Sequence, residues 1–242
     1  MRQSDLPGTA GLEPHRLVAE YTVYSCVVGS RAYGLAGPAS DIDRRGVYAV
    51  PAPLFWGLTK PPTHVDGPVA EQFSWELERC CELALQANPT VLECLWSPLV
   101  ERITSIGQEL LELRPALLSR LVGQTYGRYA ADQLSKLEAV RQRTGEVRWK
   151  QAMHMLRLLR AGAHVLRTGE VLVDVTDERE RLLAVRRAEL SWDEVHAWAA
   201  RLQEDLSQAA QRTALPVEPD RGAVTDFLVR TRRASACADG PA

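Results

Sequence analysis

The sequence predicts an α+β fold in which a small sheet with flanking helices comes first and a helical half follows. Residues 21–28, YTVYSCVV, are β-branched and aromatic, which is typical of a buried strand. Beyond about Ile103, apolar residues recur at helical spacing through most of the remaining chain. The chain has 242 residues, 45% of them hydrophobic and 25% charged, which is the composition of an ordinary globular protein. Length alone allows one large domain or two small ones.

The first half is expected to alternate strands and helices. Strands are expected where β-branched and aromatic residues lie between turn signals: 21–28, Asp41 to Val50, and Glu71 to Ser74. Helices are expected at residues 12–20, 75–87 and 89–96, with Pro89 after Asn88 marking a helix boundary. Residues 55–68 carry the glycines and prolines of a long connection.

The second half is expected to be helical, with its clearest helices at 123–142, 147–167 and 191–210. Ser191 and Glu194 have the spacing of a capping box, and Gly169 is a suitable helix stop. We therefore expect an α/β domain over 1–102, a helical domain over 103–233 and a flexible tail over 234–242. Residues 1 to about 12 are expected to be loose.

Charge and cysteine usage exclude several classes of protein. The net charge of -2 excludes a simple basic nucleic-acid binder, although a local arginine-rich face remains allowed. The five cysteines form no C-x-x-C pair and no zinc-ligand spacing, and Cys80 and Cys81 are expected to be small core residues. An odd cysteine count without a framework favours a reducing compartment. With no signal-peptide pattern and no long apolar run, we expect a cytoplasmic protein without a membrane partner.

The segment VVGSRAYGLAGPASDIDRRGVYAVP, residues 27–51, raises the question of why a Gly-Ser step lies so close to two aspartates. A strand that ends in Gly29 and Ser30 before a short helix offers N–H groups and a hydroxyl to a phosphate. Gly-Ser is also common in plain turns.

Asp41 and Asp43 are separated by one residue, and on a strand both would point to one face, roughly 7 Å apart along the chain, with Ile42 entering the core. Two neighbouring carboxylates suit a hard divalent cation such as Mg²⁺, which also holds substrate phosphates. The alternative is a pair of solvated turn aspartates with Ser40–Asp41 as a local cap.

Taken together, GSRAYG, a short spacer and SDIDRRG resemble the signature of the DNA polymerase β-like nucleotidyltransferase superfamily. RRGVYAVP, EQFSWELERCCELALQANPTVLECLWSP and WKQAMHMLRLLRAG resemble its bacterial and phage group, the RNA repair pathway DNA polymerase β family. The resemblance covers about Tyr21 to Arg230. It implies a small mixed polymerase β-like sheet, flanked by helices and followed by a C-terminal helical domain.

The resemblance also implies roles for single residues. Gly29 and Ser30 would bind the phosphates of a nucleoside triphosphate, and Asp41 and Asp43 would ligate two Mg²⁺ ions. Glu71 stands where this group usually has a third catalytic, metal-binding aspartate, which is the main departure from the pattern. Glu71 could instead be an exposed strand-edge charge. Glu76 is a competing candidate that fits better as a helix-cap partner.

Basic residues near this motif are candidates for nucleotide contacts. Lys150, His154 and Arg157 share one helix face, which would be either a cationic stripe facing the cleft or a solvated face. Arg31, Arg44 and Arg45 flank the motif, and one of them could neutralise phosphate charge. For Tyr126 and Arg128 we favour packing over stacking on a base.

The expected activity is Mg²⁺-dependent transfer of a nucleoside monophosphate from an ATP-type triphosphate to an acceptor hydroxyl, with release of pyrophosphate. The family resemblance implies an RNA end as acceptor and an RNA ligase or other repair enzyme as partner. Two alternatives stay open. One is nucleotidyl transfer to a protein, as antitoxin-type enzymes perform. The other is a catalytically silent nucleotide-binding module.

Overall fold

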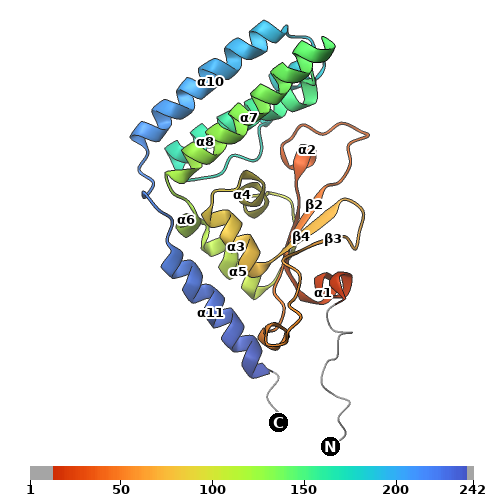
Figure 1. Ribbon diagram of the computed structural model, residues 1–242, viewed down its shortest axis with the longest axis vertical. Helices are drawn as coiled ribbons and strands as arrows, with labels where there is room; N and C mark the ends of the chain where they lie inside the picture. Colours follow the sequence, from red (N-terminus) through yellow and green to blue (C-terminus); the bar gives the residue numbers. More distant parts are fainter. Residues whose placement is uncertain (1–12, 239–242) are drawn as a thin grey trace, which may run out of the picture.

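A five-stranded mixed sheet organises the first half of the protein, as the computed structural model of residues 13–238 shows (Figure 1). The strand order is β3-β4-β2-β1-β5. The strands are β1 (Thr22–Val27), β2 (Arg44–Tyr48), β3 (His64–Asp66), β4 (Gln72–Glu76) and β5 (Val100–Ile103). β2 and β4 pair in parallel, while the other neighbours pair antiparallel. The α+β fold with a mixed sheet is therefore confirmed.

Short helices flank this sheet: α1 (Pro14–Tyr21), α2 (Gly29–Ala32), α3 (Leu77–Leu85), α4 (Pro89–Leu95), α5 (Ser105–Glu112) and α6 (Arg114–Leu117), with a 3₁₀ turn η2 (Ala52–Phe55). α4 begins at Pro89, the expected helix boundary. The Asn88 side chain accepts hydrogen bonds from the backbone of Thr90 and Val91, and Pro89 occupies the first turn, where a missing N–H costs nothing.

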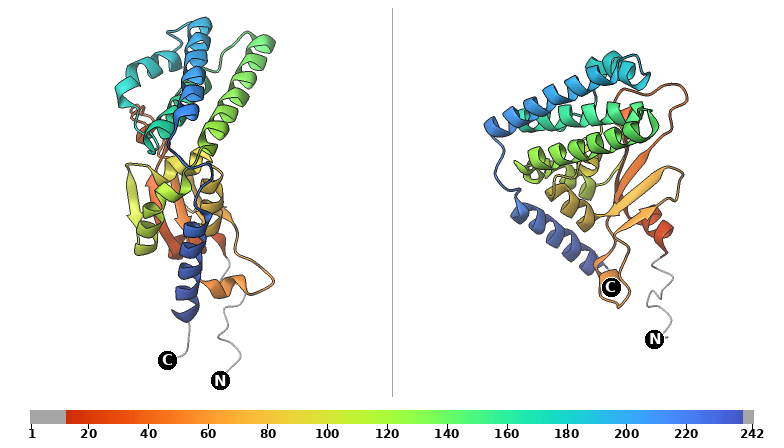
Figure 2. Two further views of the ribbon diagram at one scale, coloured as in Figure 1. Left: turned by 90° about the vertical axis from the view of Figure 1, so that its left-hand side faces the viewer. Right: turned by 45° about the horizontal axis from the view of Figure 1, so that its top comes forward.

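The second half is a bundle of α7 (Leu121–Thr144), α8 (Trp149–Thr168), α9 (Arg179–Arg186) and α10 (Trp192–Arg212), with η3 (Thr176–Glu178) before α9. α8 packs against both α7 and α10, which Figure 2 shows from two further sides. The predicted capping box is present at the start of α10. Gly169 ends α8 in the left-handed conformation, as expected of a glycine stop.

The last helix, α11 (Arg221–Ala238), returns to the sheet half and packs on α3, α5 and α6 (Figure 1). Arg232 donates to the Glu76 carboxylate at 2.6 Å and to the Val50 carbonyl at 2.8 Å, and the Ser235 hydroxyl accepts from the Ala52 N–H. The expected domain boundary at 102/103 lies within β5, and the expected tail from residue 234 begins inside α11. Residues 1–12 and 239–242 lie outside the described residues.

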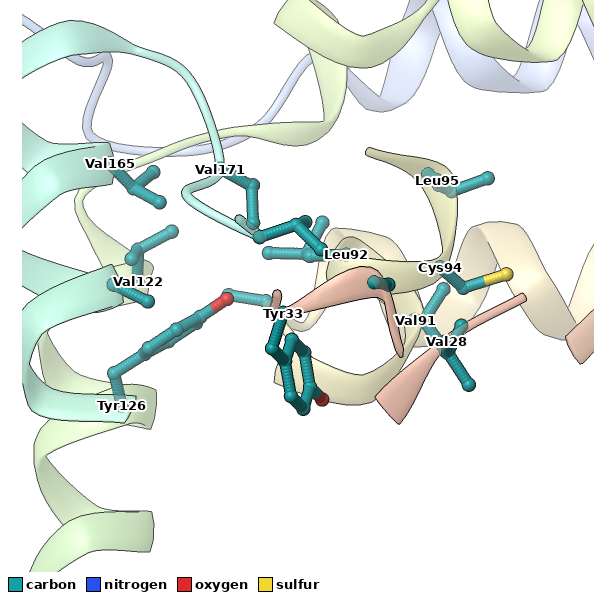
Figure 3. Packing of buried hydrophobic residues seen from close by; sticks show 14 of the residues in the cluster. Val28, Tyr33, Val91, Leu92, Cys94, Leu95, Val122, Tyr126, Val165 and Val171 are labelled. Carbon is teal, nitrogen blue, oxygen red and sulfur yellow. The ribbon is translucent and has the colours of Figure 1, made fainter. Parts of the chain in front are cut away.

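The two halves share one hydrophobic core. Figure 3 shows Val122 and Tyr126 of α7 and Val165 of α8 together with Leu92 of α4 in this core. Tyr126 is fully buried, so the expectation that it packs is confirmed. Cys80 and Cys81 are buried and free, as expected of small core residues, and Cys26 and Cys94 are buried and free as well. In residues 13–238, no helix combines the length and the apolar character that a bilayer crossing requires.

Several predicted strand boundaries are wrong. The strand expected from Asp41 begins only at Arg44, so both aspartates lie in the connection before β2, and Ile42 is 39% exposed instead of entering the core. The strand expected over Glu71–Ser74 is shifted to Gln72–Glu76. β3 and β5 were not predicted, because β3 has three residues beside a proline-rich stretch and β5 is an exposed edge with two charged residues among four.

Candidate active site

A cavity of about 580 Å³, called the first cavity here, opens where β1 ends and β2 begins. The connection between these strands lines one side of it, and helices α8 and α9 of the bundle line the other. Because β1 and β2 are antiparallel, the residues after β1 and before β2 meet at one end of the sheet. Six of the site residues predicted from sequence line this cavity: Gly29, Ser30, Asp41, Asp43, Lys150 and His154.

Gly29 and Asp43 are packed directly against each other. Gly29 has a φ of +68°, and a Cβ at this position would lie 3.3 Å from the Asp43 Cγ and overlap its Oδ2. The backbone N–H of Val28 donates to the Asp43 carbonyl at 2.9 Å. The Gly-Ser step therefore lies close to the aspartates because the absent side chain of Gly29 leaves room for a carboxylate against the turn.

Asp41 and Asp43 both line the first cavity without a protein partner. Within residues 13–238, neither carboxylate receives a hydrogen bond or forms an ion pair. Oxygen donors of this kind are the ligands that Mg²⁺ prefers, so the pair fits a hard divalent cation. The full set of three carboxylates is not assembled, since no group of three or more His, Cys, Asp or Glu in the described chain is arranged to hold a metal ion.

Glu71 lies beside this pair but outside the lining of the first cavity. It immediately precedes β4, is exposed, and has a φ of 58°. Its carbonyl accepts from the Arg44 N–H at 2.8 Å, and the parallel register of β2 and β4 continues to place Glu71 next to Asp43. The backbone of Glu71 is therefore adjacent to Asp43, while its side chain does not line the cavity with the two aspartates.

The basic residues predicted to contact a nucleotide have different positions. Arg31 does not line the cavity; its guanidinium donates to the carbonyls of Ser40 and Asp41 at 2.8 and 3.2 Å and so braces the aspartate-bearing connection. Lys150 is exposed and lines the cavity. Burial, with Arg157 and Lys150 nearby, lowers the pKa of His154 to about 4, so this imidazole is neutral at physiological pH.

Arg157 is buried and does not extend a cationic stripe into the first cavity. It is 5% exposed and donates to both oxygens of Glu93, at 2.7 and 3.2 Å. Its guanidinium lies 3.7 Å from the centre of the Tyr33 ring, and the Tyr33 hydroxyl donates to Glu93 at 2.6 Å. Burial, followed by the Glu93 charge, raises the pKa of Tyr33, so the phenol stays protonated as a donor. This network connects α8 and α4 to the residue that ends α2.

Two arginines of α9, Arg179 and Arg186, and Arg187 directly after the helix line the first cavity and were missed from the sequence. Arg179 donates to the carbonyls of Gly34 and Ala36, and Arg187 pairs with Glu189, whereas Arg186 has no ion-pair partner in the described chain. Arg186 and Lys150 are thus the two unpaired cations of the cavity. The basic segment RERLLAVRR was visible in the sequence, but nothing local indicated that it would face the aspartates.

The remaining candidates lie at the edges of the site. Arg44 pairs with Glu101 at 2.9 Å, and Arg45 lies over the Phe73 ring. Glu76 caps α3, accepting from the Glu78 N–H, so its predicted capping role is confirmed. Arg128 is exposed on α7, which contradicts the expectation that it packs.

A glycine-serine turn packed on an aspartate, at one end of a mixed sheet and opposite a helical bundle, is the arrangement of a polymerase β-type nucleotidyltransferase. The comparison with protein families makes this specific. The chain belongs to the RNA repair pathway DNA polymerase beta family, whose model matches residues 12–230. No curated protein and no solved structure gives a significant match.

Proposed function

We propose that this protein transfers a nucleoside monophosphate from a nucleoside triphosphate such as ATP to an acceptor hydroxyl at an RNA end, with Mg²⁺ and with release of pyrophosphate. The observation that carries the proposal is the first cavity, in which two unpartnered aspartates, the Gly-Ser turn and two unpaired cations come together. Family membership supports the nucleotidyl chemistry and the link to RNA repair. An RNA ligase or another repair enzyme is the proposed partner. The four free, buried cysteines support a cytoplasmic site of action.

We assign a separate role in the reaction to each group of residues in the cavity. Asp41 and Asp43 would hold the two Mg²⁺ ions that the family resemblance implies, and bound Mg²⁺ would supply charge neutralisation at the reacting phosphates. The turn at Gly29 and Ser30 would hold phosphate oxygens, with Lys150 and Arg186 as countercharges. Arg31 and Arg157 act indirectly in this proposal, Arg31 by bracing the connection and Arg157 by fixing Tyr33.

The transfer is an in-line displacement at the α-phosphorus. The acceptor oxygen forms the new bond to phosphorus, the bond to the bridging oxygen breaks, and pyrophosphate leaves with the electron pair. The acceptor proton goes to a carboxylate of the site or to solvent. Positioning and charge neutralisation supply most of the rate enhancement in such reactions.

The proposal is tested by incubating the protein with radiolabelled nucleoside triphosphates and Mg²⁺, in the presence of RNA oligonucleotides or of cell lysate. We expect labelled RNA. Labelled protein would identify the protein-modifying alternative, and no label with retained nucleotide binding would identify the silent module. Asp43→Asn should abolish labelling without lowering the free energy of unfolding, because this change removes a repulsion and no protein contact. Retained turnover in Asp43→Asn would contradict its proposed role.

Glu71 stays the proposed third carboxylate, because its backbone is hydrogen-bonded to Arg44 beside Asp43 and its exposed side chain has rotamer freedom. Glu71→Gln should lower labelling at least 100-fold while leaving nucleotide binding in place, since a general base typically contributes about 10²–10⁴-fold. Glu112→Gln, at the exposed end of α5 and without an ion pair in residues 13–238, is the matched control. Equal turnover in both variants would remove Glu71 from the mechanism and leave Asp41 and Asp43 as the only acidic candidates.

A further inference from the structure

Three cavities lie in series, the first two between the sheet half and the bundle and the third between α7 and α8. The second cavity, about 380 Å³, shares Gly29, Tyr33, Asp43 and His154 with the first. The third, about 480 Å³, shares Gln133 and Gln151 with the second. Because neighbouring cavities share lining residues, they form a continuous path that begins at Asp43 and ends between α7 and α8 on the outside of the bundle.

The second cavity offers groups that suit one nucleotide. Tyr129 of α7 lines it and is 41% exposed, so its ring is accessible to a base that enters the cavity. Gln133, Gln151 and Thr90 supply amide and hydroxyl groups that can both donate and accept hydrogen bonds. The buried Glu93–Arg157 pair lines the cavity as well, and because these two groups already satisfy each other they add little net charge. The volume is near the lower end of ligand sites, about 300–1,000 Å³, which fits a single nucleotide unit.

The third cavity is strongly basic. Lys136 and Arg143 of α7 and Arg148, just before α8, line it, and all three side chains are exposed. None of them forms an ion pair with a residue in the range 13–238, and no acidic side chain of that range lines the cavity. The formal net charge of the whole chain is -2, so this cluster is a local departure from its surroundings. Unpaired cations along a groove are typical of surfaces that follow a phosphate backbone.

We propose that the second and third cavities form the binding track for a single-stranded RNA acceptor. The terminal nucleotide occupies the second cavity, stacked on Tyr129, with its sugar hydroxyl toward Asp43. The phosphates that precede it lie along Lys136, Arg143 and Arg148. The inference rests on the proposed nucleotidyl transfer to an RNA end and adds the route along which that RNA binds. A polypeptide acceptor is less consistent with this track, because a stacking platform followed by unpaired cations matches bases joined by phosphates.

Direct binding of RNA tests the track independently of catalysis. The probe is a fluorescent ten-nucleotide single-stranded RNA with a free 3′ hydroxyl, measured by fluorescence anisotropy without nucleotide or Mg²⁺. Three phosphate contacts predict a slope of log K against log salt of about −2, at roughly 0.7 per phosphate on a single strand. Affinity should therefore fall about 20-fold between 50 and 200 mM salt. The triple variant Lys136→Gln, Arg143→Gln, Arg148→Gln should lose this salt dependence and bind the RNA at least 20-fold more weakly at 50 mM salt.

A matched control removes the same charge elsewhere. Arg201, Arg221 and Arg233 are exposed, form no ion pair within the described chain and line none of the three cavities. Their triple replacement by Gln should leave RNA affinity within 2-fold of wild type. Tyr129→Ala should weaken binding roughly 5-fold or more, because one stacked base is lost, whereas Tyr129→Phe keeps the ring and the affinity.

Three results would overturn the track: no RNA binding by the wild-type protein, equal loss in the cavity and control triple variants, or full affinity in the cavity triple variant. None of these depends on turnover. A protein that labels a polypeptide in the transfer assay and does not bind RNA would refute the track while preserving the nucleotidyl chemistry. A protein that binds RNA through these residues but transfers no label would preserve the track and refute the chemistry.

Discussion

Replacing Gly29 by alanine should disrupt the site through two separable effects. The first is conformational, because Gly29 has a φ of +68° and a left-handed residue with a Cβ costs about 1–2 kcal/mol. The second is steric, because the new Cβ would overlap the Oδ2 of Asp43 and force the carboxylate or the turn to move. Overpacking of this kind costs about 1–3 kcal/mol. The expected loss in the free energy of unfolding is the sum, about 2–5 kcal/mol.

Gly145 isolates the first effect. Its φ is +73°, and a Cβ there would meet nothing within 4 Å, so Gly145→Ala should cost only about 1–2 kcal/mol. Asp43→Ala isolates the second effect. Truncation removes the Asp43 oxygens and leaves its Cβ at 3.5 Å from the new methyl group, an ordinary contact. In the Asp43→Ala protein, Gly29→Ala should lower the free energy of unfolding by about as much as Gly145→Ala does in the wild type.

Urea denaturation of the four proteins in the cycle, and of Gly145→Ala, measures these differences, provided that the slope m is the same in all of them. A coupling free energy of about 1–3 kcal/mol between positions 29 and 43 is expected. If Gly29→Ala costs no more than Gly145→Ala, or costs the same with and without the Asp43 carboxylate, the packing of the turn on Asp43 is refuted.

Two further predictions concern the interior between the halves. Arg157→Ala leaves the Glu93 carboxylate buried without its partner and should lower the free energy of unfolding by about 3–5 kcal/mol. Arg157→Met combined with Glu93→Gln should recover most of this loss in the same denaturation assay. Equal losses in the single and the double variant would contradict a buried-charge penalty. His154 has a folded pKa of about 4, below the value of 6.5 for an unperturbed imidazole, so the unfolded chain binds the proton first as pH falls. Between pH 6.5 and pH 4, the free energy of unfolding of the wild type should therefore decline by up to about 3 kcal/mol more than that of His154→Gln. Parallel profiles of unfolding free energy against pH for the two proteins would show that this imidazole is not shielded from solvent.

The helices could be predicted from the sequence, because the signals that start and stop them are local. Helical periodicity, Asn88 before Pro89, the Ser191–Glu194 pair and Gly169 each act within one or two turns, and the corresponding helices α4, α8 and α10 are present. β3 and β5 depend instead on pairing with strands distant in sequence, and their own residues carry little hydrophobic pattern. The return of α11 to the sheet half is likewise a tertiary effect that its own sequence does not indicate.

In the candidate site, too, residues that are close in sequence could be predicted, whereas residues placed by tertiary packing could not. Gly29, Ser30 and the two aspartates lie within one short segment, residues 29–43, so their proximity could be predicted even though the strand boundary was wrong. Arg157 has the spacing to face the cleft with Lys150 and His154, yet it is buried because Glu93 and Tyr33 supply a carboxylate and a ring inside the protein. Arg186 could not be assigned, because its place opposite the aspartates depends on how α9 packs on α8.

The return of α11 has a consequence during synthesis on the ribosome. Glu76 meets Arg232 and Ala52 meets Ser235 only after nearly the whole chain has been translated. A nascent chain that ends within the bundle holds a sheet half with one flank exposed, including the buried carboxylate of Glu76 without its cation. The order of translation thus delays completion of the sheet half until the last helix has emerged.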